Sequence, residues 1–77
     1  MTPKQKALIV EALEQAADTA QNAMLHAKCA LIDLKYDDPD HAASRAVSIF
    51  QEASKAQHAA TRAGAWLDYV TRPGDEN

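Results

Sequence analysis

Two long amphipathic stretches with a single break between them constrain the fold of this sequence more than any other feature. The break is Asp37-Asp38-Pro39-Asp40, and no proline or glycine interrupts residues 4–36 before it. After the break, apolar residues keep a helical spacing to about residue 71. Apolar residues that recur every three or four positions indicate amphipathic helices. The sequence therefore predicts an all-α, antiparallel two-helix hairpin with an alanine-rich coiled-coil seam.

A capping pattern marks the start of the first helix. In Thr2-Pro3-Lys4-Gln5 the threonine hydroxyl can accept from free backbone N–H groups, proline suits the first helical position, and Gln5 completes a capping box. The first helix is expected at about residues 3–36, the second at about 39–71, and each would be about 50 Å long. Together they form one domain over residues 1–77.

The acidic break is typical of a turn followed by a helix cap. Asp38 can cap the second helix, Pro39 suits its first position, and Asp40 adds favourable negative charge near its N-terminus. Capping thus explains two carboxylates without a ligand, while Asp37 leaves room for weak cation binding. The turn is expected at residues 37–39. Pro73-Gly74 would end the second helix, leaving a short polar tail at 72–77.

The predicted seam follows apolar residues at alternating steps of three and four. In the first helix it is Val10, Leu13, Ala17, Ala20, Met24, Ala27, Leu31 and Leu34. In the second helix it is Ala42, Ala46, Ile49, Ala53, Ala56, Ala60, Ala63, Leu67 and Val70. When the chain folds back at Asp38, large residues of one helix face small residues of the other, as Leu31 faces Ala46. This match predicts close packing of the two helices.

A mostly alanine-lined flank beside the predicted seam indicates further assembly. A two-helix hairpin leaves apolar residues uncovered, and a chain of 77 residues without a disulfide is near the lower limit for a stable core. A second hairpin could pack closely on a flank of this kind. We expect a homodimer or larger oligomer, such as a four-helix bundle, with this interface: Ile9, Ala16, Ala23, Ala30, Ala59 and Trp66.

A second apolar patch lies near the turn, on a face of the first helix that points away from the predicted seam. One interpretation is that the patch is another part of an oligomer core. The other is that it recognises a different protein, with Tyr36 and Phe50 as aromatic anchors. The first helix also contributes Cys29 to it. The predicted partner-binding residues are Leu25, Ile32, Tyr36, Val47 and Phe50.

Charge and composition argue against several classes of protein. The formal net charge is −3 and the basic residues are scattered, so nucleic-acid binding is not expected as the main activity. The apolar run from Ala7 to Val10 is too short to span a membrane. The single cysteine, Cys29, cannot form an intrachain disulfide and suits a reducing compartment. A cytoplasmic protein without membrane contact is therefore expected.

No set of residues has the spacing of a catalytic or metal site. The histidines are His26, His41 and His58, which are far apart in the sequence. Cys29 lies three residues after His26, but no third group is placed to orient such a pair, and packing is the better interpretation. We expect no enzyme activity, no metal and no cofactor.

The overall plan is similar to small dimeric hairpins in general, including plasmid RNA-binding regulators, secretion co-chaperones and short phage-encoded inhibitors. This resemblance implies a protein that blocks, escorts or sequesters something. The predicted function is non-enzymatic protein–protein interaction, as an inhibitor, anti-activator or co-chaperone that a phage could encode. An alternative is an oligomer that holds a small anionic ligand such as a nucleotide at subunit junctions, and a dimeric RNA-binding regulator is the third. The nucleotide alternative uses basic and aromatic candidates: Lys28, Lys35, Arg45, Arg62, Arg72, Tyr36, Trp66 and Tyr69.

Overall fold

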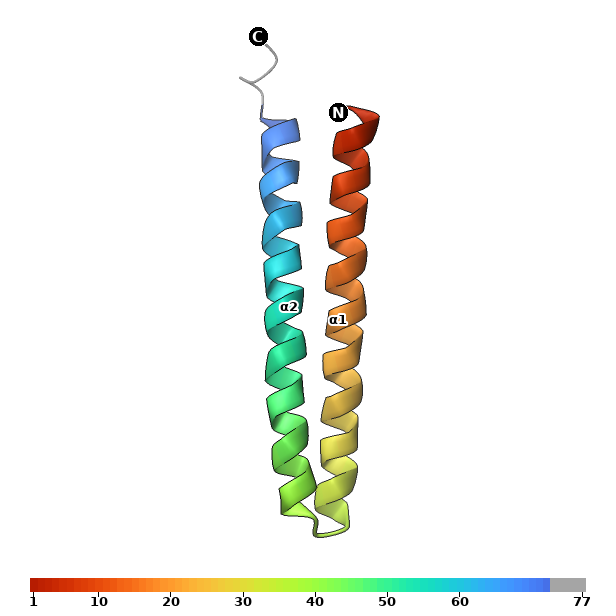
Figure 1. The fold of residues 1–77 in the computed structure, drawn as a ribbon, viewed down its shortest axis with the longest axis vertical. Coiled ribbons are helices and arrows are strands. Elements are labelled where there is room, and N and C mark those ends of the chain that lie inside the picture. Colours follow the sequence, from red (N-terminus) through yellow and green to blue (C-terminus); the bar gives the residue numbers. More distant parts are fainter. Residues whose placement is uncertain (73–77) are drawn as a thin grey trace.

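Two antiparallel helices make up the structure, a computed structural model that describes residues 1–72. Helix α1 spans Pro3–Lys35 and helix α2 spans Pro39–Thr71, each of 33 residues. They lie side by side along their whole length, and the start of α1 and the end of α2 share the open end of the hairpin (Figure 1). The predicted all-α hairpin is confirmed. The predicted helix stop at Pro73-Gly74 and most of the polar tail fall outside the described residues.

The capping box predicted at the start of α1 is present. The Thr2 Oγ1 atom accepts a hydrogen bond from the Gln5 backbone N–H at 3.1 Å, and Gln5 Oε1 accepts from the Thr2 N–H at 2.8 Å. These two bonds satisfy donors that the first helical turn leaves without partners. Pro3 occupies the first helical position, as its missing N–H favours.

Helix α1 ends one residue earlier than predicted, in a closed hydrogen-bonded cap. The Asp38 N–H donates to the Asp33 carbonyl at 2.9 Å, and the Asp37 N–H donates to the Leu34 carbonyl at 3.1 Å. This pair of bonds is a Schellman motif, which needs a residue in the left-handed region after the helix. Asp37 takes that role with φ 56°, the position that glycine usually occupies.

The same short turn starts α2, as the sequence predicts. An Asp38 carboxylate oxygen accepts from the His41 backbone N–H at 3.2 Å, and Pro39 is the first helical residue. The other Asp38 oxygen lies 2.6 Å from His41 Nδ1. The turn is therefore held by backbone and side-chain hydrogen bonds that involve two of its acidic residues.

The observed seam differs from the predicted one. Buried and half-buried residues of α1 recur at steps of three and four, one position before the predicted residues: Ile9, Ala12, Ala16, Thr19, Ala23, His26, Ala30 and Asp33. In α2 the seam residues are Ala42, Arg45, Ile49, Glu52, Ala56, Ala59, Ala63, Trp66 and Val70. The α1 prediction is thus wrong in phase, and the α2 prediction is right at five positions and one residue off at the others.

The wrong phase predicted for the α1 seam has a simple geometric reason. Two neighbouring stripes of α1, one residue apart, both have the three-and-four spacing, and spacing alone does not say which stripe faces α2. Helix α1 turns its stripe of smaller residues inward, and in the open half side chains such as Ala12 and Ala59 let the two backbones approach closely. Large residues such as Leu13 and Leu31 remain exposed.

The core of the hairpin is small and lies in its open half. Only four residues in the described part of the chain are buried: Ile9, Ala12, Ala59 and Ala63. Toward the turn the seam becomes polar, and Arg45 Nε lies 3.6 Å from Asp33 Oδ2. Both atoms are shielded from solvent and make no hydrogen bond. The hairpin therefore buries little apolar surface of its own.

Candidate interaction surfaces

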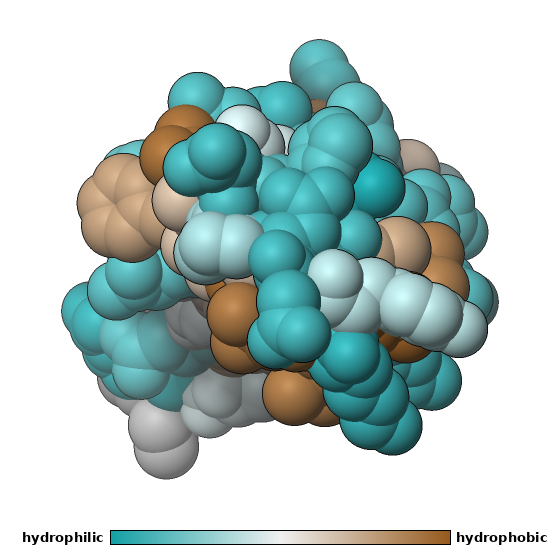
Figure 2. All heavy atoms as spheres, turned by 90° about the horizontal axis from the view of Figure 1, so that it is seen from below, coloured by the Kyte–Doolittle hydropathy of each residue, from teal (hydrophilic) through white to brown (hydrophobic). Residues whose placement is uncertain are grey.

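Large apolar side chains lie mostly on the outside of the hairpin. Fourteen of them, aromatic ones included, are more than a third exposed, from Met1 to Tyr69. Viewed along the hairpin from the turn end, hydrophobic residues reach the surface on several sides of the molecule (Figure 2). Scattered apolar residues are normal on protein surfaces, whereas continuous stripes indicate surfaces that another molecule covers.

One continuous stripe of this kind runs along both helices, and we call it the broad apolar face. Each of its residues directly follows a seam residue, so each is rotated by about 100° from the seam. Because the helices are antiparallel, this rotation turns both stripes to the same side of the hairpin. The α1 members are Val10, Leu13, Ala17, Ala20, Met24, Ala27, Leu31 and Leu34. The α2 members are Ala43, Ala46, Phe50, Ala53, Gln57, Ala60, Gly64 and Leu67.

Over residues 10–34 and 43–67 the broad apolar face carries no charged residue, and Gln57 is its single polar member there; Lys6 and Thr71 continue the two stripes at the open end. All of its residues are exposed except Ala27, which is half-buried. It contains the residues that the sequence analysis assigned to the α1 seam. The residues predicted for the α1 seam therefore do not face α2 but lie on this outer surface.

The residues predicted as an oligomer interface belong instead to the seam of the hairpin. Ile9 is 5% exposed and Ala59 is fully buried, because the other helix covers them. The remaining four are half-buried seam residues: Ala16, Ala23, Ala30 and Trp66. The predicted interface is therefore corrected: these six residues pack within the hairpin, between its own two helices.

The predicted partner-binding residues do not share one surface: they point in three different directions from the hairpin. Leu25, Cys29 and Ile32 each directly precede a seam residue, which turns them to the side opposite the broad apolar face. With Tyr36, the residue that ends α1, they form what we call the turn-end patch. Phe50 follows Ile49 and lies on the broad apolar face.

Val47 belongs to neither surface. It is two residues from the nearest seam positions, Arg45 and Ile49, and therefore points to the back of α2, away from α1. The prediction that Val47 and Phe50 share a surface with Leu25 and Ile32 is thus not supported by the geometry of the seam. The sequence-based placement failed because it started from the wrong seam phase.

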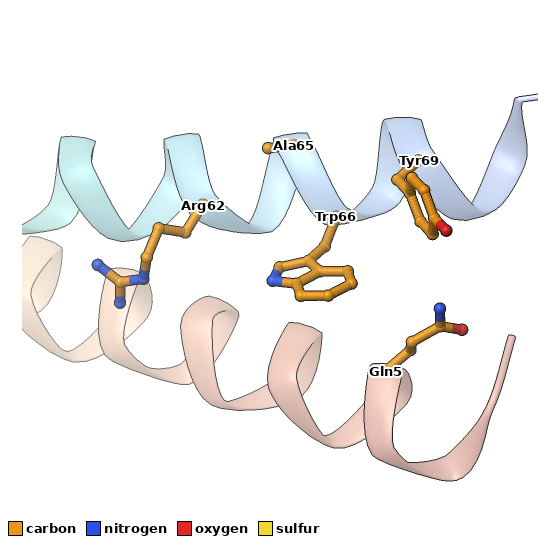
Figure 3. Close-up of a pocket in the computed structure, with 5 residues that line it drawn as sticks. All are labelled: Gln5, Arg62, Ala65, Trp66 and Tyr69. Carbon is orange, nitrogen blue, oxygen red and sulfur yellow. The ribbon is translucent and has the colours of Figure 1, made fainter.

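A pocket of about 470 Å³ opens at the open end of the hairpin, on the same side as the turn-end patch. Figure 3 shows Trp66 reaching from α2 toward α1, with Tyr69 and Gln5 beyond it and Arg62 on the other side. The Trp66 and Tyr69 rings meet edge to face, 6.1 Å between centroids. The Arg62 guanidinium donates to Gln15 Oε1 across the two helices. Sequence reasoning named three of these residues as ligand candidates but did not place them together.

Two side chains at the start of α2 shift each other's pKa. The hydrogen bond from Asp38 raises the pKa of His41 above 6.5, and the same bond lowers the pKa of Asp38 below 3.8. Other charged residues form ion pairs at the surface, such as Lys55 with Glu52 at 3.5 Å. Among residues 1–72 no three His, Cys, Asp or Glu side chains gather as a metal site would require. Within that same range neither helix has an apolar stretch that could cross a membrane.

Comparison with known proteins adds no functional assignment. No family model, no curated protein and no solved structure matches this chain. Function must therefore be argued from the surfaces alone.

Proposed function

We propose that this chain is a non-enzymatic binding protein that acts by protein–protein interaction. One observation carries the proposal: most large apolar side chains are exposed, while three of the four buried residues in the described part of the chain are alanines. Exposed apolar surface of this extent is typical of proteins that other proteins cover. Inhibitors, anti-activators and co-chaperones, including phage-encoded ones, act in this way. The lone Cys29 favours a reducing compartment such as the cytoplasm.

The turn-end patch is the proposed contact for a different protein. Leu25 and Ile32 are about half exposed, and Tyr36 is 80% exposed. All three come from one helix at intervals that suit a helix lying in the groove of a partner. Aromatic residues are enriched among the side chains that dominate binding energy. Tyr36 is therefore the expected anchor of the contact.

Affinity capture followed by calorimetry tests this proposal. Proteins captured by the wild-type chain are identified, purified and titrated against variants of the full chain. We expect Ile32→Glu to abolish binding and Tyr36→Ala to weaken it at least tenfold. Both positions are exposed, so helicity measured by circular dichroism should be unchanged.

Lys28→Glu is the matched control, because Lys28 is exposed on the same helix outside the patch. It should bind as the wild type does. If Ile32→Glu and Lys28→Glu bound equally well, the turn-end patch would not be the contact. Loss of helicity in Ile32→Glu would show a structural role instead.

A small anionic ligand with an aromatic ring is the second candidate, supported by the pocket at the open end. Arg62, Trp66 and Tyr69 line one concave site, which combines a guanidinium with two aromatic rings. A guanidinium pairs well with phosphate, and an aromatic face can stack on a base. Its volume of about 470 Å³ lies within the range of ligand pockets.

Thermal melting with nucleotides tests this second candidate. A bound nucleotide should raise the Tm by mass action, and the increase should disappear in Arg62→Ala. Lys55→Ala, which removes an exposed cation from the same helix outside the pocket, should keep it. No increase with any nucleotide at millimolar concentration would exclude this ligand class.

A further inference from the structure

We propose that the broad apolar face is covered by a second copy of this chain, which forms a four-helix bundle with a two-fold axis parallel to the helices. This inference does not rest on the proposed function, because the turn-end patch lies on the opposite side of the hairpin. It replaces the interface predicted from the sequence, whose residues the intrachain seam uses. Four observations support it.

The first observation is the amount of exposed surface. The chain has 5830 Å² of accessible surface, whereas a folded monomer of 8.4 kDa exposes about 4,600 Å². Two helices side by side, each about 50 Å long and about 10 Å wide, present a face of the order of 1,000 Å². Stable interfaces bury about 800 Å² per partner, so this one face is large enough for a dimer.

The second observation is the absence of charge. The protein has a net charge of −3, which disfavours contact between copies through charged surfaces. The broad apolar face has no charged member over residues 10–34 and 43–67, and Lys6 continues the α1 stripe only at the open end. Two copies can therefore meet there without like-charge repulsion at the contact and without burying an unpaired charge.

The third observation is Gly64, in the interior of α2 on this face. Glycine inside a helix is unfavourable compared with alanine, so its presence needs a reason. A Cβ atom at Gly64 would meet nothing within 4 Å, so the isolated hairpin supplies no such reason. Close approach of another backbone or of a large side chain does supply one.

The fourth observation fixes the orientation of the second copy. The Arg62–Gln15 hydrogen bond and the Arg45–Asp33 ion pair show which residues of α1 and α2 lie at the same height along the hairpin. The residue numbers of such a pair add up to about 77. On the broad apolar face α1 carries five large residues, whereas α2 carries Phe50 and Leu67. Equal spacing between the four helices requires the bulky α1 stripe of one copy to meet the small α2 stripe of the other.

A two-fold axis parallel to the helices produces this arrangement, because it places α1 over α2 of the second copy at equal levels. Leu13 then faces Gly64 of the second copy, and Leu31 faces Ala46. In the same way Met24 faces Ala53. The large-to-small match seen in the sequence thus holds between copies. The opposite orientation would stack the bulky stripes of the two α1 helices on each other.

Solution mass of the full chain, by light scattering and sedimentation equilibrium, tests the proposal. We expect the wild type at about 50 µM to have twice the monomer mass of 8.4 kDa. Gly64→Leu should raise the dimer dissociation constant at least tenfold, because the larger side chain blocks close approach. Ala20→Glu should do the same by placing a charge at the centre of the interface. Neither change should reduce the helicity of the chain, since both positions are exposed in the hairpin.

Each variant has a neighbour as its matched control. Ala65→Leu places the same side chain on the opposite side of α2, and Gln21→Glu places the same charge on the outer face of α1. Both should remain dimeric. A monomeric wild type would overturn the proposal and assign the face to a different protein. A dimer that tolerates Gly64→Leu and Ala20→Glu as well as their controls would overturn it too.

Distances between spin labels test the orientation. A nitroxide on Lys35→Cys, in a Cys29→Ser background, marks the turn end of each copy. The proposed axis brings both turn ends to one end of the bundle, so the two labels should lie well within 40 Å. The opposite orientation would separate them by about 50 Å, the length of a helix, and would overturn the parallel axis.

Discussion

Single residues at the turn combine two structural roles. Asp38 closes the cap of α1 through its N–H and starts α2 through its carboxylate. The carboxylate also binds the His41 ring, so the start of α2 depends on the charge of both groups. Asp37 contributes its backbone conformation rather than its charge.

The Asp38–His41 contact should make the turn sensitive to pH. The raised pKa of His41 means that its contribution is complete below pH 6.5 and is lost as the pH rises through the raised value. The lowered pKa of Asp38 means that its contribution is complete above pH 3.8 and is lost as the pH falls through the lowered value. The contact therefore stabilises the turn most between these two ordinary values.

Nuclear magnetic resonance titration of the His41 ring measures this effect. We expect Asp38→Asn to bring the pKa of His41 back toward 6.5, because asparagine keeps the cap but removes the charge. Asp40→Asn, next to the cap but without a contact to the ring, should leave the titration unchanged. An identical His41 titration in the wild type and Asp38→Asn would contradict this explanation.

The Asp33–Arg45 pair should be coupled in stability. We expect Asp33→Ala and Arg45→Ala each to lower the free energy of unfolding by about 1–2 kcal/mol, since each leaves a partly shielded charge alone. The double variant should lose clearly less than the two single losses combined. Urea denaturation measures all three. The exposed Arg72–Asp68 pair is the comparison and should show coupling below about 0.5 kcal/mol.

At the scale of elements, the two helices are specified by their ends and pack most closely in the open half, through alanines such as Ala12, Ala59 and Ala63. The capping box starts α1, the Schellman motif ends it, and Asp38 with Pro39 starts α2. Between these ends the seam presents alanine to alanine in its open half. The turn and the seam each lead to one prediction.

Replacing Asp37 by glycine should stabilise the turn. A residue other than glycine in the left-handed region is strained, and φ at Asp37 is 56°. We expect Asp37→Gly to raise the free energy of unfolding by about 0.5–1 kcal/mol and the Tm by several degrees. Asp37→Val should lower both. Differential scanning calorimetry measures the Tm of each variant. Equal Tm values for the glycine and valine variants would show that the left-handed conformation of Asp37 is not strained.

The phase of the seam can be tested with enlarged alanines. Ala59 is fully buried, so Ala59→Leu should lower the free energy of unfolding by about 1–3 kcal/mol through overpacking. Ala65→Leu, on the exposed side of the same helix, should change it by less than about 0.5 kcal/mol. Similar losses at both positions would mean that α2 turns a different stripe toward α1.

The whole molecule has more apolar surface than two helices can cover. Its core is small, and the broad apolar face and the turn-end patch are both exposed, so the proposed dimer would add stability that the single hairpin lacks. The two exposed surfaces lie on opposite sides, so a dimer formed through one would still display two copies of the other.

Thermal stability should therefore depend on protein concentration. Because the dimer is a bound state of the folded chain, raising the concentration should raise the Tm by mass action. Melting curves from about 1 to 100 µM measure the trend. For Gly64→Leu the Tm should depend less on concentration, because its dimer is weaker, whereas Ala65→Leu should behave as the wild type does. A wild-type Tm independent of concentration would contradict association.

The sequence by itself determined the elements of this protein. Thr2, Asp38 and the two prolines at helix starts are local signals, and the structure uses them where the sequence predicts. The helical class, the single turn and the antiparallel arrangement follow from these signals and from the length of the apolar pattern. Only the end of α1 differs, by one residue, because Tyr36 serves as the cap.

Only the tertiary structure decided which stripe of each helix faces the other. Ile9 and Val10 start two stripes with the same spacing, so periodicity could not choose between them. The choice depends on how closely two backbones can approach, which is a property of both helices together. Small residues such as Ala12 and Ala63 allow the closest approach, and they form the seam. This one-residue change of phase turned the predicted α1 seam outward and revealed the broad apolar face.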